Sequence, residues 1–345
     1  MAARAYPHPP VRPDWLAQVS EEILEPDLPM IDPHHHLWHE RPSGRYMPEE
    51  LLADLNSGHR ILATVFLQCG WMHRKQGPEP ERPAGETEAV NAAAVLSATG
   101  AYGPSRACAG IVGWADLRSP ALEQTLDAHQ QAAPSRFRGI RQIAAADPAI
   151  VPSYATPSPP QLLRDPDFQR GLRRLGERGL TFDSFCFHPQ LADLLEAARG
   201  APETMIVIDH LGGPLGCGPY RSMHDEVLEA WSAGMAALAS CRNVYVKLGG
   251  LGMPVNGFDY HVEPTPPPSE RIARDWRPFI EPCIEWFGPD RCMFESNFPV
   301  DKAMVSYPVL WNAFKRLAHG ASSDEKALLF YGTARAFYRL DVRVS

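Results

Sequence analysis

The sequence lacks several patterns that would each define a class of protein. No apolar run approaches the ~20 residues of a membrane-spanning helix, so we expect no membrane partner. The first 29 residues contain no apolar core typical of a signal peptide, and the seven cysteines form no CxxC pair. An odd number of thiols without such pairs argues against a disulfide framework and favours a reduced, cytoplasmic protein.

Positive charge is scarce relative to negative charge. Lys and Arg number 33 against 41 Asp and Glu, which gives a net charge of −8. An acidic chain repels the phosphates of nucleic acids, so we expect no nucleic-acid partner and a small-molecule substrate instead. With 44% hydrophobic and 21% charged residues, the composition is that of an ordinary folded domain.

Proline, in contrast, is abundant. The chain has 35 prolines, roughly twice the usual share of ~5%. Proline and glycine concentrate in segments 70–85, 144–164 and 252–270. These segments predict long, stiff loops, which is where binding and catalytic residues are commonly placed.

Short apolar runs alternate with helical patterns along the chain. The runs are rich in β-branched and aromatic residues, as expected for strands that are buried on both faces. Helical patterns follow Ser119-Pro120 and Asp165-Pro166, and others cover 190–199, 222–240 and 269–287. The eight predicted strands cover residues 30–37, 61–68, 107–114, 138–143, 181–187, 205–208, 244–248 and 292–294.

Eight strands that alternate with helices predict an α/β fold, a (β/α)8 TIM-type barrel over residues 30–345. Residues 1–29 are expected to form an N-terminal extension around it. The alternative is an open doubly wound sheet, but the GxGxxG turn typical of that fold is absent. The ring of helices is compatible with a homo-oligomer, although the sequence shows no interface.

The strongest chemical signal is segment 31–38, which reads Ile-Asp-Pro-His-His-His-Leu-Trp. On a strand, His34 and His36 share one face and His35 points away. Two imidazoles ~6–7 Å apart along one strand can chelate one metal or flank one substrate atom. The alternative is a histidine-rich surface turn, which the preceding apolar strand makes less favourable.

Two further strand ends carry polar groups. Residues 205–208 lead into Asp209-His210-Leu211-Gly212, which places His210 at the expected barrel mouth. Glu295 and Asn297 follow the last strand and are two residues apart, so both can face the interior. A buried carboxylate is costly unless it is paired or functional. The alternatives are a satisfied core histidine and a structural ion pair of Glu295 with Lys247 or an arginine.

The remaining candidates would bind substrate. Arg141 ends a predicted strand and suits bidentate capture of a carboxylate, whereas Arg138 lies on the opposite face. Lys247 is an amine within a buried run, where its role is either functional or structural. The other expected substrate-binding residues are Trp38, Gln68 and His188.

Together these motifs resemble the amidohydrolase superfamily, in particular the amidohydrolase-related branch of sugar lactonases and 2-pyrone-4,6-dicarboxylate lactonase. The resemblance covers roughly residues 28–341. It implies a distorted barrel whose site uses the histidine pair, a later histidine and an acid after the last strand. Where a zinc or manganese ion is bound, it implies His34, His36 and His210 as ligands. The supporting segments are 34–38, 139–141, 209–212, 244–248, 294–299 and 331–338.

One position departs from the family pattern. After the last strand the family reads Gly-Ser-Asp-(Trp/Phe)-Pro, and this chain reads Glu295-Ser296-Asn297-Phe298-Pro299. An amide cannot take a proton from water and is a poor metal ligand. Either the site has lost that chemistry, or Glu295 supplies the carboxylate and Asn297 donates a hydrogen bond to substrate. Because the branch includes metal-free hydrolases, we expect no cofactor or one divalent metal, with the metal-free form slightly favoured.

Three functions follow from these residues. The first is a hydrolase that opens a lactone or ester of a small acidic or aromatic compound. Its catalytic residues would be His34, His36, His210, Glu295 and Asn297, with Glu295 or His188 as general base. The second is a metal-dependent decarboxylase or C–C hydrolase of an aromatic acid. The third is a barrel that binds a ligand without catalysis.

Overall fold

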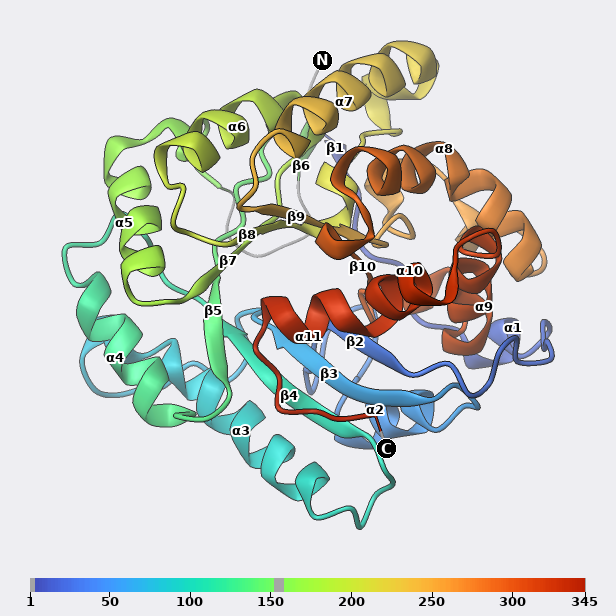
Figure 1. Cartoon of the computed structure of the whole chain (residues 1–345), viewed down its shortest axis with the longest axis horizontal. Coiled ribbons are helices and arrows are strands. Elements are labelled where there is room, and N and C mark those ends of the chain that lie inside the picture. The colour runs from blue at the N-terminus through green and yellow to red at the C-terminus, as the bar shows by residue number, and fades with distance from the viewer. Residues whose placement is uncertain (1–3, 152–157, 345) are drawn as a thin grey trace.

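The computed structural model describes residues 4–151 and 158–344. It contains an eight-stranded parallel sheet curled into a nearly closed barrel with helices around it, which confirms the predicted fold (Figure 1). Each strand pairs in parallel with the next along the chain. Every predicted apolar run contains one strand. The strands are β2 Met30–His35, β3 Ile61–Leu67, β4 Arg106–Gly113, β5 Phe137–Arg141, β7 Thr181–Ser184, β8 Ile206–Ile208, β9 Val244–Leu248 and β10 Cys292–Phe294.

Helices follow the strands as the sequence pattern predicts. Asp165 caps α5 by accepting the Asp167 N–H at 2.8 Å, and Pro166 is its first residue. The helix expected after Ser119-Pro120 begins only at Leu122, because the Ser119 hydroxyl and carbonyl hold a turn there first. The helices are α1 Pro13–Leu16, α2 Pro48–Leu55, α3 Ala84–Ala98, α4 Leu122–Ala132, α5 Pro166–Glu177, α6 Leu191–Gly200, α7 His224–Ala239, α8 Ser269–Phe287, α9 Tyr307–Leu317, α10 Ser323–Ala327 and α11 Thr333–Phe337.

The barrel closes between its first and last strands through a short seam. His35 and Phe298 form an isolated parallel bridge, and the His36 N–H donates to the Phe298 carbonyl at 2.8 Å. Asp32 accepts the Ser296 N–H and the Tyr307 hydroxyl, both at 3.0 Å. Burial raises the pKa of this carboxyl to about 6. Asp32 therefore links β2 to the segment after β10.

The end of the chain fills one end of the barrel. Phe337, Tyr338, Leu340 and Val342 pack against interior residues such as Val65. Figure 1 shows α11 and the segment after it crossing the barrel on the side nearest the viewer. Leu340 is 3% exposed. Because hydrophobic side chains occupy this end, access to the barrel interior is left to the opposite end.

The opposite end carries a second apolar group, which we call the mouth cluster. Its members come from loops that follow the carboxyl ends of β2, β5, β7, β8, β9 and β10, the end where barrel enzymes place their sites. Its buried members are Trp38, Ala145, Ile150, Phe185, Phe187, Leu215, Cys217, Met253, Val255 and Val300.

The segment before β2 does not join the barrel sheet. Its strand β1, Arg4–Ala5, pairs in parallel with β6, Ile150–Val151, in the loop after β5. Further along, the Leu24 N–H donates to Asn312 and Lys315 donates to the Leu24 carbonyl, so this part lies against α9. The boundary at residue 29 stays a prediction.

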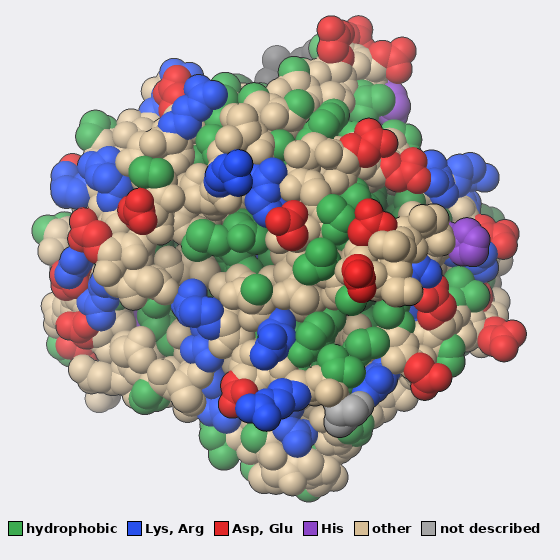
Figure 2. Space-filling view, in the orientation of Figure 1, with side chains coloured by type: hydrophobic (Ala, Val, Ile, Leu, Met, Phe, Trp, Pro, Cys, Tyr) green, Lys and Arg blue, Asp and Glu red, His purple; other side chains and the backbone are tan. Residues whose placement is uncertain are grey.

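Surface features are unremarkable on the face seen in Figure 2, where Lys and Arg side chains are intermixed with Asp and Glu. Among the described residues, no helix combines the length and apolarity that crossing a membrane requires.

Candidate functional site

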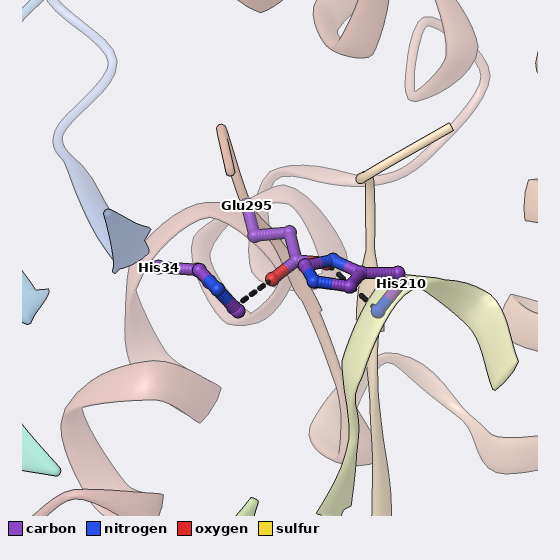
Figure 3. A group of neighbouring side chains, drawn as sticks. All are labelled: His34, His210 and Glu295. Carbon is purple, nitrogen blue, oxygen red and sulfur yellow. Dashed lines mark hydrogen bonds and ion pairs between the residues drawn. The ribbon is translucent and has the colours of Figure 1, made fainter. Parts of the chain in front are cut away.

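Three residues from distant parts of the sequence meet at the carboxyl end of the barrel. His34 lies on β2, His210 follows β8 and Glu295 follows β10 (Figure 3). Potential ligand atoms of the three lie within 4.8 Å of one another. His34 and Glu295 are fully buried, and His210 is 2% exposed. The chain therefore builds a small, enclosed polar centre where barrel enzymes place their chemistry.

Glu295 bridges the two histidines with its two oxygens. Its Oε2 lies 2.7 Å from His34 Nδ1, and its Oε1 lies 2.8 Å from His210 Nδ1. The His210 backbone N–H also donates to Oε1 at 3.0 Å. Burial alone would raise the pKa of Glu295, but the two imidazoles hold it well below its usual range. Glu295 is therefore an ionised carboxylate that fixes both rings.

The contacts of each ring assign its protonated nitrogen. His210 and His34 face Glu295 with Nδ1, and His36 Nδ1 lies 2.8 Å from the Leu67 carbonyl. Each of these acceptors requires an N–H, so each ring carries its proton on Nδ1. Lys247 Nζ also lies 3.2 Å from His34 Nδ1, but Glu295 Oε2 is closer to that nitrogen, at 2.7 Å. All three Nε2 atoms are then unprotonated.

These Nε2 lone pairs suit a divalent metal. His34 Nε2 and His36 Nε2 lie 3.2 Å apart, close to the ~3.3 Å between two nitrogens on one tetrahedral zinc. Burial and Lys247 lower the pKa of His34 to about 4, and burial and Arg141 lower the pKa of His36 well below its usual value. Neutral imidazole is the form that binds metal. A carboxylate behind the ring is also a common means of orienting such ligands.

The backbone around His210 is built for this arrangement. His210 and Leu211 both have φ of 54°, a left-handed conformation that is uncommon for residues other than glycine. Across from them, a Cβ on Gly250 would overlap the His210 ring, and one on Gly249 would overlap Glu295. The Gly249-Gly250 pair after β9 therefore provides the space in which His210 and Glu295 meet.

A buried charge network lies beneath His34. Lys247 Nζ is 2.7 Å from Asp183 Oδ1 and 2.9 Å from Asp209 Oδ1, and the Tyr338 hydroxyl donates to Asp183. Although burial opposes it, Lys247 and His34 hold the pKa of Asp209 well below its usual range. Lys247 was expected to bind substrate, but it is fully buried and paired with these two carboxylates. Its position suits a role in fixing the charge beneath His34.

Arg141 reaches the same centre from β5. Its NH1 lies 3.3 Å from His34 Nε2 and 3.6 Å from Asp209, and its NH2 donates to the Gln68 carbonyl. Gln68 thus contributes its backbone carbonyl, which holds Arg141. Trp38 stacks on His36 with ring centroids 5.9 Å apart and an interplanar angle of 19°. Arg141, Gln68 and Trp38 therefore lie around the histidine pair, and their roles in substrate binding stay predictions.

Two candidates make their described contacts with residues other than His34, His210 and Glu295. Asn297 donates to Asp301 at 2.9 Å, and the other Asp301 oxygen accepts the Gly252 N–H at 3.0 Å. His188 Nδ1 accepts the Leu215 N–H at 3.2 Å and its ring packs against Tyr220. The roles of Asn297 and His188 in catalysis stay predictions.

Four acidic residues near the centre were not singled out from the sequence. Asp183 lies on β7 and Asp32 lies on β2, so their strand positions were the available signal. Asp209 stood beside His210 in its motif, whereas Asp301 carries no sequence signal beyond its position four residues after Asn297. Burial raises the pKa of Asp301 to about 7.

Comparison with known proteins agrees with this geometry. The model of the family described as Amidohydrolase matches residues 31–340. The chain belongs to this family. The y4mH protein of Sinorhizobium fredii (strain NBRC 101917 / NGR234) is 34% identical over 335 residues, which cover 91% of this chain and 99% of that protein. This chain is thus an amidohydrolase-family enzyme, as the motifs indicated.

Two similar proteins come from Burkholderia multivorans. An L-fucono-1,5-lactonase of strain ATCC 17616 / 249 is 28% identical over 325 residues, covering 90% of this chain and 96% of the lactonase. A crystal structure of an amidohydrolase with bound zinc has a TM-score of 0.69 at 24% identity, covering 90% and 99% of the two chains. At that identity the structural likeness shows the fold alone.

Proposed function

We propose that this enzyme is a hydrolase that opens a lactone ring, most favourably a small lactone with polar or acidic substituents. The observation that carries the proposal is Glu295, which bridges His34 and His210 through their Nδ1 atoms. The similarity to an L-fucono-1,5-lactonase over almost the full chain supports the same reaction class.

The chain's own residues suit attack by water on an ester carbonyl. In the metal-free site His210 Nε2 can accept a proton from water, because its Nδ1–H is held by Glu295. The Glu295 carboxylate then stabilises the imidazolium that forms, as the acid of a catalytic triad does. Glu295 therefore acts as a positioning residue behind His210. Arg141, 4% exposed, supplies positive charge toward the developing oxyanion or an acidic substituent.

The donor set also fits a resident divalent metal, zinc in particular. Ligand atoms of His34, His210 and Glu295 lie within 4.8 Å of one another, and His34 Nε2 lies 3.2 Å from His36 Nε2, so these four residues would hold it. When bound, the ion would act as a Lewis acid on the carbonyl oxygen and lower the pKa of water. The ion would then not need Asn297 as a ligand. The asparagine that replaces the family's aspartate would therefore not prevent metal-assisted hydrolysis.

Acid release in a weakly buffered pH-indicator assay tests the proposal. Zinc-loaded protein should hydrolyse L-fucono-1,5-lactone or another sugar 1,5-lactone well above the spontaneous rate, and elemental mass spectrometry should find about one metal per chain. Loss of activity on chelation and its return with zinc would assign activation of the water to the ion, whereas unchanged activity would assign it to His210 and Glu295. Failure of both the metal-loaded and the metal-free protein to open any lactone of such a panel would contradict the proposal.

A further inference from the structure

The N-terminal residues 4–12, which we call the strap, cross the mouth of the barrel. At one end β1 pairs with β6 in the loop after β5. At the other end the Val11 N–H donates to the Ser43 carbonyl at 3.1 Å, in the loop after β2. Arg12 donates to the His261 carbonyl in the loop after β9. Three loops at the carboxyl ends of the strands therefore anchor the strap from different sides of the barrel.

The middle of the strap packs on the mouth cluster. Tyr6 is partly buried against that cluster. Its hydroxyl oxygen lies 3.2 Å from where a Cβ on Gly218 would be. Gly218 has φ of 56°, so this glycine suits both the turn and the close approach of Tyr6. The strap is therefore fitted to the loops beneath it.

His8 lies in this part of the strap, between Tyr6 on the mouth cluster and Val11, which donates to the loop after β2. Its Nδ1 is shielded from solvent and has no hydrogen-bond partner among residues 4–151 and 158–344. Burial, and to a lesser extent the charge of Arg41, lowers the pKa of His8 to about 4. His8 is therefore neutral at pH 7. A buried polar nitrogen without a partner is costly unless a ligand satisfies it.

Arg41 lies in the loop that anchors the strap, two residues before Ser43, whose carbonyl accepts the Val11 N–H. Its guanidinium carbon lies 4.5 Å from the centroid of the Trp38 ring, which in turn stacks on His36. The loop thus places a guanidinium between the strap and the histidine pair. An imidazole N–H and a guanidinium can both donate hydrogen bonds to an oxygen atom. The described contacts of Glu295 are with His34 and His210, which suits recognition of a substituent by His8 and Arg41 away from the reacting carbonyl.

We propose that His8 is a substrate-binding residue that the strap adds to the site, where with Arg41 it binds an oxygen substituent of the lactone ring. The inference rests on the proposed lactonase function and deepens it. The family model begins only at residue 31, so this part of the site lies outside the region shared by the family. His8 would then determine specificity, while the histidines of the barrel perform the reaction.

Two lactones with the same ring separate these roles. L-Fucono-1,5-lactone carries hydroxyl substituents, and δ-valerolactone is the unsubstituted six-membered ring. His8→Phe should lower kcat/KM about 10-fold for the substituted lactone, mainly through KM, and leave δ-valerolactone unchanged. His8→Gln, which keeps a side-chain donor and acceptor, should recover part of the loss. His319→Phe, at an exposed histidine, is the matched control and should change neither substrate.

Each other outcome counts against the inference. An equal loss on both lactones would mean that His8 acts only through the fold, and no loss on either would mean that it does not contact substrate. If the wild type opens these lactones and His8→Phe shows no selective loss on the substituted one, only the assignment of His8 is overturned. Absence of turnover by the wild type on both lactones would overturn the assignment together with the lactonase function.

Discussion

Glu295 holds two histidines with one carboxylate, and an amide cannot reproduce this. In Glu295→Gln one imidazole N–H would face an NH2 group, and the negative charge that stabilises the imidazolium would be lost. We expect kcat/KM for an accepted lactone to fall by ~10²–10⁴-fold. Bound zinc per chain should fall as well. Steady-state assays and elemental analysis measure the two effects.

Glu226→Gln is the control for this variant, because Glu226 is an exposed carboxylate on α7. It should retain wild-type activity and metal content. A Glu295→Gln protein with wild-type kcat/KM and wild-type metal content would remove Glu295 from the site.

A second residue-scale prediction concerns Glu86 on α3, which is 1% exposed. Its Oε1 accepts the Cys69 and Trp71 N–H groups at 3.0 and 2.7 Å, while burial raises its pKa from 4.5 to about 7. A carboxyl whose folded pKa is raised stabilises the fold fully below the unfolded pKa. This contribution is lost as pH rises from about 4.5 through 7.

Glu86→Gln removes this titration. Its free energy of unfolding, relative to wild type, should therefore increase by about 2 kcal/mol between pH 5.5 and pH 8. Urea unfolding of both proteins at the two pH values measures the difference, with the exposed Glu203→Gln as control. A difference that does not change with pH would show that Glu86 does not titrate in this range.

At the scale of elements, the Gly249-Gly250 turn after β9 decides whether His210 can reach Glu295. Gly250 has φ of 71°, and a Cβ there would overlap the His210 ring. Gly179 has a similar φ of 64° but no atom within 4 Å of its Cβ position. Both alanine variants should lose about 1 kcal/mol of stability from backbone strain. Only Gly250→Ala should also lose activity, by at least about 10-fold.

Thermal unfolding measures the stability of the two alanine variants, and lactone turnover measures their activity. Equal activity in Gly250→Ala and Gly179→Ala would show that the turn does not position His210.

The elements themselves were predictable because each strand is a short apolar run buried on both faces. The alternation of side chains on β2 likewise placed His34 and His36 on one face, and Arg141 at its strand end. Contacts between distant segments were not predictable in this way. Asp183 meets Lys247, and Asp301 meets Asn297, only because the barrel brings separate strand ends together. The position of His8 depends in turn on how the strap crosses three loops.

At the scale of the whole molecule, stability depends on the last residues of the chain as well as on the barrel. Leu340 is 3% exposed and packs beside Gly110 and Val65 in the barrel interior. Leu340→Ala should therefore lower the free energy of unfolding by about 2–4 kcal/mol. Val344, which is 47% exposed, provides the control, since Val344→Ala should be neutral. Urea unfolding measures both, and equal midpoints would show that the end of the chain does not support the barrel.

The seam between β2 and β10 has a consequence for how the enzyme matures. His34 and Glu295 stand on opposite sides of that seam, on the first and last barrel strands, so a partly synthesised chain without β10 cannot assemble the donor set. The metal would thus bind only after the barrel has closed. An ion held there would bind only the closed form and would stabilise it by mass action. Metal supply in the cell would then govern how long the finished protein lasts as well as how fast it turns over.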